Sequence, residues 1–340
     1  MNSISLEATT RMLVISGKGI LAADESLPTI QKRFKALGIE STEETRRAYR
    51  ELLFTTGGIE KFISGVILFE ETLRQKTAGG SSFVEVLTRK GIIPGIKVDK
   101  GTIGMPNSLQ EKITAGRDGL RERLQEYVRL GARFTKWRAV ITIGAAIPSR
   151  ACMYVNAHDL ALFAALSQEA GLVPIVEPEI LMDGDHDIAR CEEVTSAMLE
   201  LVFDAIRAHH VMLDGMLLKP NMVLSGKQSA KQASPSEVAD RTIRTLRRTV
   251  PAAVPGILFL SGGQTPELAT EHLNIMNARG PHPWELSFSY ARALQDPALK
   301  AWAGSASNAR EAQYLFYQRA KCNGNARFGT YSKQMEKMAA

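Results

Sequence analysis

Cysteine is scarce in this chain of 340 residues. Cys152, Cys191 and Cys322 are the only three, and no two of them form a Cys-x-x-Cys pair. An odd number of widely separated cysteines argues against a disulfide framework and against a zinc knuckle. The thiols indicate a reducing compartment, and we expect a cytoplasmic protein.

Long hydrophobic runs are also missing. No stretch approaches the roughly 18 consecutive apolar residues of a membrane-spanning helix. Residues 1–10 lack the basic cluster and apolar core of a targeting segment. We therefore expect no membrane partner. With 44% hydrophobic and 23% charged residues, the composition is that of a globular protein with enough apolar material for a core.

A strong excess of one charge is absent as well, since the formal net charge is +6. The densest basic group lies on a predicted helix and comprises Arg241, Arg244, Arg247 and Arg248. Such a helix usually presents its charges to solvent, so we expect no nucleic-acid partner. The modest positive charge favours small anionic ligands, such as phosphorylated metabolites.

Short β-rich apolar runs recur along the chain, and longer segments with helical periodicity separate them. Residues 42–54, 158–169 and 195–209 are examples of the predicted helices. The eight predicted strands cover residues 19–23, 65–69, 95–98, 134–140, 173–176, 215–218, 256–260 and 285–289.

Eight parallel strands that alternate with helices close into a (β/α)8 TIM barrel. We predict an α/β fold with a single domain over residues 1–340. Its barrel core covers about residues 17–310, after an N-terminal helical extension, and a C-terminal helical arm covers about residues 311–340.

Charged and small polar residues collect at the ends of these strands, where the active site of such a barrel lies. Each alone has an ordinary structural explanation as a helix cap, a surface ion pair or a turn. Together they bring more charge than a barrel needs, and buried charges require partners or a ligand. The candidates are Asp24, Ser26, Lys97, Lys136, Arg138, Glu177, Glu179, Lys219, Ser261, Gly262 and Arg292.

Lys219 lies where an apolar run stops, within Leu217-Leu218-Lys219-Pro220-Asn221-Met222. It is either a lysine that extends from a core strand to solvent or a nucleophile. Burial disfavours the ammonium form, so the free amine can attack a carbonyl and form a Schiff base. The charge of Lys136 would strengthen that effect. Glu177 could move protons while a carbinolamine loses water, and Asp24 could act at a substrate hydroxyl.

Two groups of candidates suit phosphate. The turn Ser261-Gly262-Gly263 offers amides, and Arg292 offers a planar guanidinium that matches phosphate oxygens. Lys97, Ser26 and Arg138 form a second group that could hold another anion. The pattern therefore predicts a substrate with one carbonyl and two phosphates.

Long ordered motifs in this chain resemble those of class I fructose-bisphosphate aldolases, which form Schiff bases. The resemblance covers nearly the whole length. The matching runs are Gly17–Ser26, Gly95–Gly101, Lys136–Arg138, Val176–Leu181, Leu217–Met222, Leu260–Gln264 and Phe288–Tyr290.

The resemblance implies a metal-independent lyase of glycolysis and gluconeogenesis, without a cofactor. It would split fructose 1,6-bisphosphate reversibly into glycerone phosphate and glyceraldehyde 3-phosphate, and would form a homotetramer. Lys219 would carry the Schiff base, and Glu177 would act as acid and base with support from Glu179. Asp24 and Lys136 would serve carbon–carbon cleavage. Ser261, Gly262 and Arg292 would bind the C1 phosphate, and Ser26, Lys97 and Arg138 the C6 phosphate.

Three features depart from the family pattern or compete with it. Many members end in a tyrosine that assists proton transfer, whereas the last tyrosine here is Tyr331. We therefore predict that protonation of the enamine depends on another group or is slower than in those members. Ala291 replaces a usual glycine, and alanine would be strained if that position needs a positive φ or a very close backbone approach, the alternative being an ordinary backbone conformation. The segment Asp183–Asp187 offers carboxylates and a histidine for a metal, but a turn and helix cap is the more ordinary interpretation.

Two other functions stay open on the sequence. One is a transaldolase, or an aldolase for a different sugar phosphate such as the seven-carbon bisphosphate. The other is a scaffold that binds a polymer through its basic surface and keeps an inactive pocket.

Overall fold

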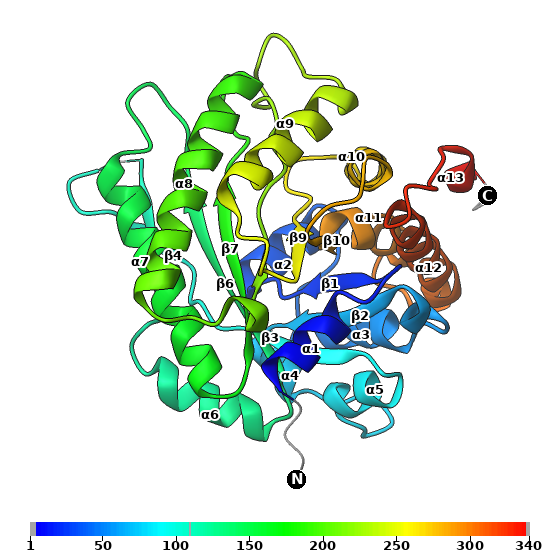
Figure 1. The fold of residues 1–340 in the computed structure, drawn as a ribbon. Coiled ribbons are helices and arrows are strands. Elements are labelled where there is room, and N and C mark those ends of the chain that lie inside the picture. Colours follow the sequence, from blue (N-terminus) through cyan, green and yellow to red (C-terminus); the bar gives the residue numbers. More distant parts are fainter. Residues whose placement is uncertain (1–4, 109, 338–340) are drawn as a thin grey trace.

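The computed structural model describes residues 5–108 and 110–337, and its centre is a closed barrel of eight parallel strands surrounded by helices (Figure 1). Residues 1–4 and 338–340, which belong to the two chain ends considered above, lie outside the described residues. The predicted TIM barrel is therefore confirmed. Its strands are β1 (Gly19–Ala23), β2 (Ile63–Leu68), β3 (Ile93–Lys97), β6 (Phe134–Ile141), β7 (Val173–Ile180), β8 (Leu217–Leu218), β9 (Gly256–Phe259) and β10 (Glu285–Tyr290).

Helices follow the strands, and both predicted helical extensions are present. Side chains of Ser149, Asp187, Ser234 and Thr265 cap four of the helix N-termini, as their residue types favour. The assignment of residues 1–340 to one domain stays a prediction. The helices are α1 (Leu6–Leu13), α2 (Leu27–Lys35), α3 (Glu43–Thr55), α4 (Glu70–Arg74), α5 (Phe83–Arg89), α6 (Leu120–Arg129), α7 (Arg150–Glu169), α8 (Ile188–Ala208), α9 (Pro235–Thr249), α10 (Pro266–Ala278), α11 (Arg292–Trp302), α12 (Ala309–Ala326) and α13 (Gln334–Lys337).

Several strand boundaries differ from the prediction. Strand β7 was expected to end at Val176 but continues to Ile180, because its pairing with β6 extends to the register Ile141↔Ile180. Strand β8 is shorter than expected, since Gly215 belongs to a 3-10 turn, η2 (Leu213–Gly215). The sequence also gave no sign of the small antiparallel hairpin of β4 (Thr102–Gly104) and β5 (Lys112–Thr114).

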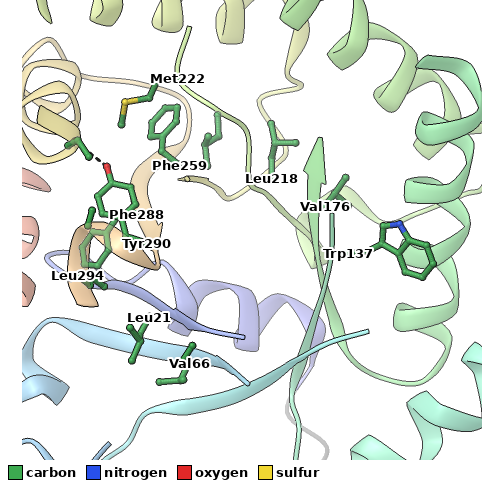
Figure 2. Packing of buried hydrophobic residues seen from close by; sticks show 14 of the residues in the cluster. Leu21, Val66, Trp137, Val176, Leu218, Met222, Phe259, Phe288, Tyr290 and Leu294 are labelled. Carbon is green, nitrogen blue, oxygen red and sulfur yellow. Dashed lines mark hydrogen bonds between the residues drawn. The ribbon is translucent and has the colours of Figure 1, made fainter. Parts of the chain in front are cut away.

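Two apolar layers follow from the alternation of side chains along each strand. Val176, Leu218 and Trp137 face outwards and pack in the large cluster between strands and helices, as Figure 2 shows. Ile175 and Leu217, one position earlier, belong to a separate cluster inside the barrel. Residues that follow at the next inward positions therefore point into the upper barrel.

The lower end of the barrel is filled by side chains. Leu13, at the end of α1, and Val14 pack in the inner cluster together with Phe134. Glycine is needed beside them, because a Cβ on Gly95 would lie 2.4 Å from the Phe134 ring and one on Gly256 would lie 2.5 Å from Val14. The N-terminal extension thus closes the barrel at the end opposite the charged residues.

The C-terminal arm is fastened to the barrel helices. Helix α12 lies beside α11 (Figure 1), and its buried Arg319 donates to the carbonyl oxygens of Ala293 and Pro266 at 3.1 and 2.7 Å. Arg319 also pairs with Glu336. None of the helices in the described parts of the chain is both long and apolar enough to span a bilayer. The three cysteines are buried free thiols.

Candidate active site

A cleft of about 720 Å³ opens at the C-terminal end of the barrel strands. It exists because inward positions that are apolar low in the barrel become polar higher up. On β7, Ile175 is followed on the same face by Glu177 and Glu179, and Leu217 on β8 is followed by Lys219, just beyond the end of that strand. All eleven residues predicted from the sequence line this cleft, namely Asp24, Ser26, Lys97, Lys136, Arg138, Glu177, Glu179, Lys219, Ser261, Gly262 and Arg292.

Four buried charged side chains form a chain of ion pairs in the centre of the cleft. The Lys219 Nζ atom lies 3.1 Å from Glu177 Oε1, and Lys136 Nζ lies 3.2 Å from Glu177 Oε2. Lys136 Nζ also lies 2.6 Å from Asp24 Oδ2. Each of these four side chains is at most 11% exposed, so the charges meet away from bulk water.

The charges of these four side chains depend on one another. Burial raises the pKa of Asp24, but the charges of Lys136 and Lys219 outweigh it and lower that pKa to about 2. Burial likewise opposes protonation of Lys136, yet the carboxylates of Asp24 and Glu177 hold its pKa far above the ordinary value. Lys136 therefore stays a cation and Asp24 a carboxylate throughout the neutral pH range.

The backbone around Lys219 is held by the residues of its own motif. The Lys219 N–H donates to the Val176 carbonyl at 2.8 Å, which continues the ladder beyond the end of β8. The Asn221 side chain accepts from the Ile180 N–H at 2.9 Å, and the Pro220 carbonyl accepts from the Leu260 N–H at 3.1 Å. Proline and asparagine thus join β8 to both neighbouring strands, which fixes Lys219 at the base of the cleft.

The rim of the cleft carries two further ion pairs. The Arg138 guanidinium contacts the Glu179 carboxylate, and Lys97 Nζ lies 2.5 Å from Asp99 Oδ1. Asp99 also accepts from the Arg138 N–H at 3.3 Å. Both cations proposed for the C6 phosphate are therefore present at the rim, and each is held by a carboxylate.

Ser26 completes this side of the cleft. It is the N-cap residue of α2, but its hydroxyl makes no capping hydrogen bond and lies 3.0 Å from the Thr29 hydroxyl. The Ser26 hydroxyl therefore lies at the rim and does not cap α2.

The other anion group lies at the ends of β9 and β10. Gly263 has φ 72°, which turns the chain from Ser261 and Gly262 into α10. Arg292 is the first residue of α11, and among the described residues its guanidinium has no hydrogen bond or ion pair. Ala291 has φ −98°, which lies outside the positive-φ region that favours glycine.

The sequence did not single out Ser289, which also lines the cleft. Its buried hydroxyl has no hydrogen-bond partner in the described part of the chain. It lies two residues after Ser287 on β10, and this alternation placed both serines on one face of the strand. Apart from the matching run Phe288–Tyr290, that spacing was the signal that the sequence offered, and it does not tell which serine reaches the cleft.

The segment Asp183–Asp187 forms a turn and a helix cap. Asp187 is the N-cap of α8 and accepts from the Arg190 N–H at 2.8 Å, while Asp183 pairs with Lys227 at 2.8 Å. Within residues 5–108 and 110–337, no three His, Cys, Asp or Glu side chains are grouped to hold a metal ion. The carboxylates of Asp183 and Asp187 therefore have other partners.

Tyr331 is packed away from the cleft. Its side chain is buried, its N–H donates to Asn274 Oδ1 at 2.8 Å, and its hydroxyl donates to Glu336 Oε1 at 2.9 Å. It is not among the residues that line the cleft. In this conformation Tyr331 belongs to the attachment of the arm.

The chain is similar over nearly its whole length to proteins of one family. The model of the family fructose-bisphosphate aldolase class-I matches residues 5–340. A probable fructose-bisphosphate aldolase class 1 of Xanthomonas campestris pv. campestris is 56% identical over 335 residues, which cover 97% of this chain and 99% of that protein.

A plant protein and a solved structure give similar matches. Cytosolic fructose-bisphosphate aldolase 4 of Arabidopsis thaliana is 52% identical over 332 residues, which cover 97% of this chain and 84% of that protein. Fructose-bisphosphate aldolase of Plasmodium falciparum, solved in complex with TRAP and a small-molecule inhibitor, has a TM-score of 0.95 at 51% identity. That match covers 96% of this chain and 95% of the solved one.

Proposed function

This chain belongs to the class I fructose-bisphosphate aldolases, which are metal-independent lyases, and we propose that its reaction proceeds through a Schiff base on Lys219. The substrate is fructose 1,6-bisphosphate, and the products are glycerone phosphate and glyceraldehyde 3-phosphate. The observation that carries this proposal is the buried Lys219, 3.1 Å from Glu177, in a cleft with cationic groups on both sides.

The first half of the reaction forms the imine. Glu177 takes a proton from the Lys219 ammonium, and the resulting amine attacks C2 of the ketone and passes a further proton to the ketone oxygen, which gives a carbinolamine. Glu177 then donates a proton to the departing hydroxyl, so that water leaves and an iminium ion remains. Its distances of 3.1 and 3.2 Å to the two lysines support this role. Glu179, which pairs with Arg138, supports the same centre.

The second half breaks the bond between C3 and C4. The Asp24 carboxylate accepts the proton of the C4 hydroxyl, which becomes the aldehyde of glyceraldehyde 3-phosphate. The electrons of the broken bond move to the iminium nitrogen and leave an enamine. Lys136 remains positively charged beside Asp24 and Glu177 and stabilises this arrangement. Protonation at C3 and hydrolysis then release glycerone phosphate and restore the Lys219 amine.

The two phosphates would orient the substrate between the anion groups. Ser261, Gly262 and Arg292 bind the C1 phosphate, for which backbone amides and a guanidinium have suitable geometry. Ser26, Lys97 and Arg138 bind the C6 phosphate at the rim. Because Tyr331 is occupied by Glu336, a group other than Tyr331 protonates the enamine.

Borohydride trapping tests the assignment of Lys219. Reduction in the presence of glycerone phosphate should leave a covalent adduct on Lys219, which peptide mass spectrometry identifies. Lys219→Met should give no adduct and no cleavage, and activity should survive EDTA. Lys227→Met is the matched control, because Lys227 lies outside the cleft and pairs with Asp183. An adduct on another lysine would refute the assignment.

Substrate preference is tested on the same preparation. Turnover should be higher on fructose 1,6-bisphosphate than on singly phosphorylated sugars, since both anion groups are then occupied. Faster turnover on the seven-carbon bisphosphate would assign the enzyme to that substrate instead.

We also propose a homotetramer in the cytoplasm. The assembly is inferred from membership of the family. The location is supported by the relative described as cytosolic in Arabidopsis thaliana. Analytical ultracentrifugation should give four times the mass of one chain, and a monomer or dimer would refute the tetramer.

A further inference from the structure

Gln295 is a fully buried polar residue on α11 that does not line the cleft. Its Nε2 atom donates to the carbonyl oxygen of Ala22, on β1, at 2.6 Å. Its Oε1 atom accepts from the Tyr49 hydroxyl at 3.2 Å, and longer contacts of 3.4 and 3.5 Å reach Arg33 and Arg50. One side chain thus connects β1, α2, α3 and α11.

The hydrogen bond from Gln295 to Ala22 takes the place of a strand-to-strand hydrogen bond that β10 does not supply. Strand β1 pairs with β2 as far as Ala23↔Leu68, but its pairing with β10 ends at Leu21↔Tyr290. The reason is that the chain leaves β10 at Ala291 and enters α11. The Gln295 amide therefore donates to the Ala22 carbonyl of β1, beyond the last residue pair that β1 forms with β10. Without this donor the buried carbonyl would be unpaired, which costs free energy.

The charged groups around Gln295 are balanced. Glu25 accepts from both Arg33 and Arg50, and Arg33 also pairs with Asp296 at 2.8 Å. The neutral oxygen of Gln295 accepts in the middle of these two cations without adding charge. A carboxylate at this position would keep the acceptor but would lose the donor that Ala22 needs.

Asp24 lies two residues after Ala22, so both side chains belong to the same face of the chain. Its carboxylate must reach Lys136 and, on the proposed mechanism, the C4 hydroxyl of the substrate. We propose that Gln295 is a positioning residue for Asp24. Its hydrogen bond to Ala22 holds the end of β1 at the position along the barrel axis that the contact between Asp24 and Lys136 requires.

The inference rests on the proposed role of Asp24, and two reactions of the same enzyme separate it from a general structural role. Cleavage of fructose 1,6-bisphosphate needs Asp24 as base. Exchange of the C3 proton of glycerone phosphate needs the imine on Lys219 but no C4 hydroxyl, and so does not need Asp24.

The test compares Gln295→Met and Gln295→Glu with wild type in both reactions. We expect kcat for cleavage to fall about tenfold or more in both variants, since a displaced catalytic group loses that much or more. The exchange rate and KM for glycerone phosphate should stay within about twofold of wild type if only the position of Asp24 has changed. Tyr49→Phe is the control, because it removes one donor to Gln295 and keeps the bond to Ala22.

Three outcomes would overturn the inference. Unchanged cleavage in Gln295→Glu would show that the amide donor is not needed. An equal fall of cleavage and exchange would indicate a general structural role, and so would an effect of Tyr49→Phe as large as that of Gln295→Met. If Gln295→Met does not fold, Gln295→Glu still decides. Full cleavage activity in Asp24→Asn would instead refute the proposed function, whatever the Gln295 variants do.

Discussion

The Lys136 Nζ atom lies 2.6 Å from Asp24 Oδ2, and both side chains are buried in the upper barrel. The pair joins β6 to the end of β1 across the interior. It keeps Asp24 ionised, with its pKa lowered to about 2. An aspartate so placed is available as a proton acceptor at every pH at which the enzyme would work.

Replacing Asp24 should separate imine formation from cleavage. In Asp24→Asn we expect kcat for cleavage to fall about 10²- to 10⁴-fold, the range for loss of a general base. Borohydride should still trap glycerone phosphate on Lys219, because Glu177 is retained. Asp204→Asn, which changes an exposed aspartate on α8, is the control and should have wild-type activity. Loss of trapping in Asp24→Asn would show that Asp24 is needed before cleavage.

Crowding the turn after β9 should weaken substrate binding. A Cβ on Gly262 would lie 3.0 Å from Glu179 Oε1 and 3.0 Å from Leu260 Cδ1. In Gly262→Ala we expect KM for fructose 1,6-bisphosphate to rise about tenfold, since overpacking costs ~1–3 kcal/mol. Gly104→Ala is the matched control, because its Cβ would meet nothing within 4 Å. An unchanged KM in Gly262→Ala would remove Gly262 from the phosphate site.

His272 should make stability depend on pH. It is buried on α10, its Nδ1 lies 2.7 Å from Gln264 Oε1, and burial lowers its pKa from 6.5 to about 4. The unfolded chain thus binds this proton at higher pH than the folded chain does. Above pH 6.5 His272 is neutral in both the folded and the unfolded chain, so it costs no stability. As the pH falls from 6.5 towards 4, the free energy of unfolding decreases by about 3 kcal/mol, because the unfolded chain takes up the proton first.

Urea unfolding at several pH values measures this dependence. His272→Gln should give a shallower fall between pH 6.5 and 4 than wild type. His210→Gln, at an exposed position, should keep the wild-type slope. Equal slopes in wild type and His272→Gln would show that His272 is not the group responsible.

Tyr331 should matter for stability and not for proton transfer. Tyr331→Phe removes the hydrogen bond to Glu336, so we expect a loss of about 0.5–1.5 kcal/mol in the free energy of unfolding. The rate of proton exchange on glycerone phosphate should be unchanged. Truncation after Thr330 is a less specific test, because it also removes Glu336, the partner of Arg319. A large loss of exchange in Tyr331→Phe would show that the arm moves to the cleft.

The alternation of side chains made much of the site predictable from sequence. Lys136 and Arg138 share a face two residues apart, and so do Glu177 and Glu179, and the structure places all four in one cleft. The length of β7 was not predictable, because glutamate is depleted in ordinary strands. Only a closed barrel with a polar upper interior allows charged residues to continue the ladder as far as Ile180.

Other features depend on contacts that no local pattern contains. The hairpin of β4 and β5 has three residues in each strand, and its Ile103 is 54% exposed, so it lacks an apolar alternation. Ser287 and Ser289 are equivalent in the sequence. Ser287 donates to the Lys18 carbonyl low in the barrel, whereas Ser289 reaches the cleft. The position of each serine along the barrel axis decides which of them lines the cleft. That position follows only from the register of all eight strands.

Leu13 and Val14 close the lower end of the barrel, which leaves the cleft as a chamber entered from the strand ends. Substrate and both products must then use the same entrance. On the proposed mechanism the aldehyde fragment is free after cleavage, whereas the other fragment is still bonded to Lys219. The aldehyde therefore leaves first, and the second product follows through the same opening once its bond to Lys219 is hydrolysed.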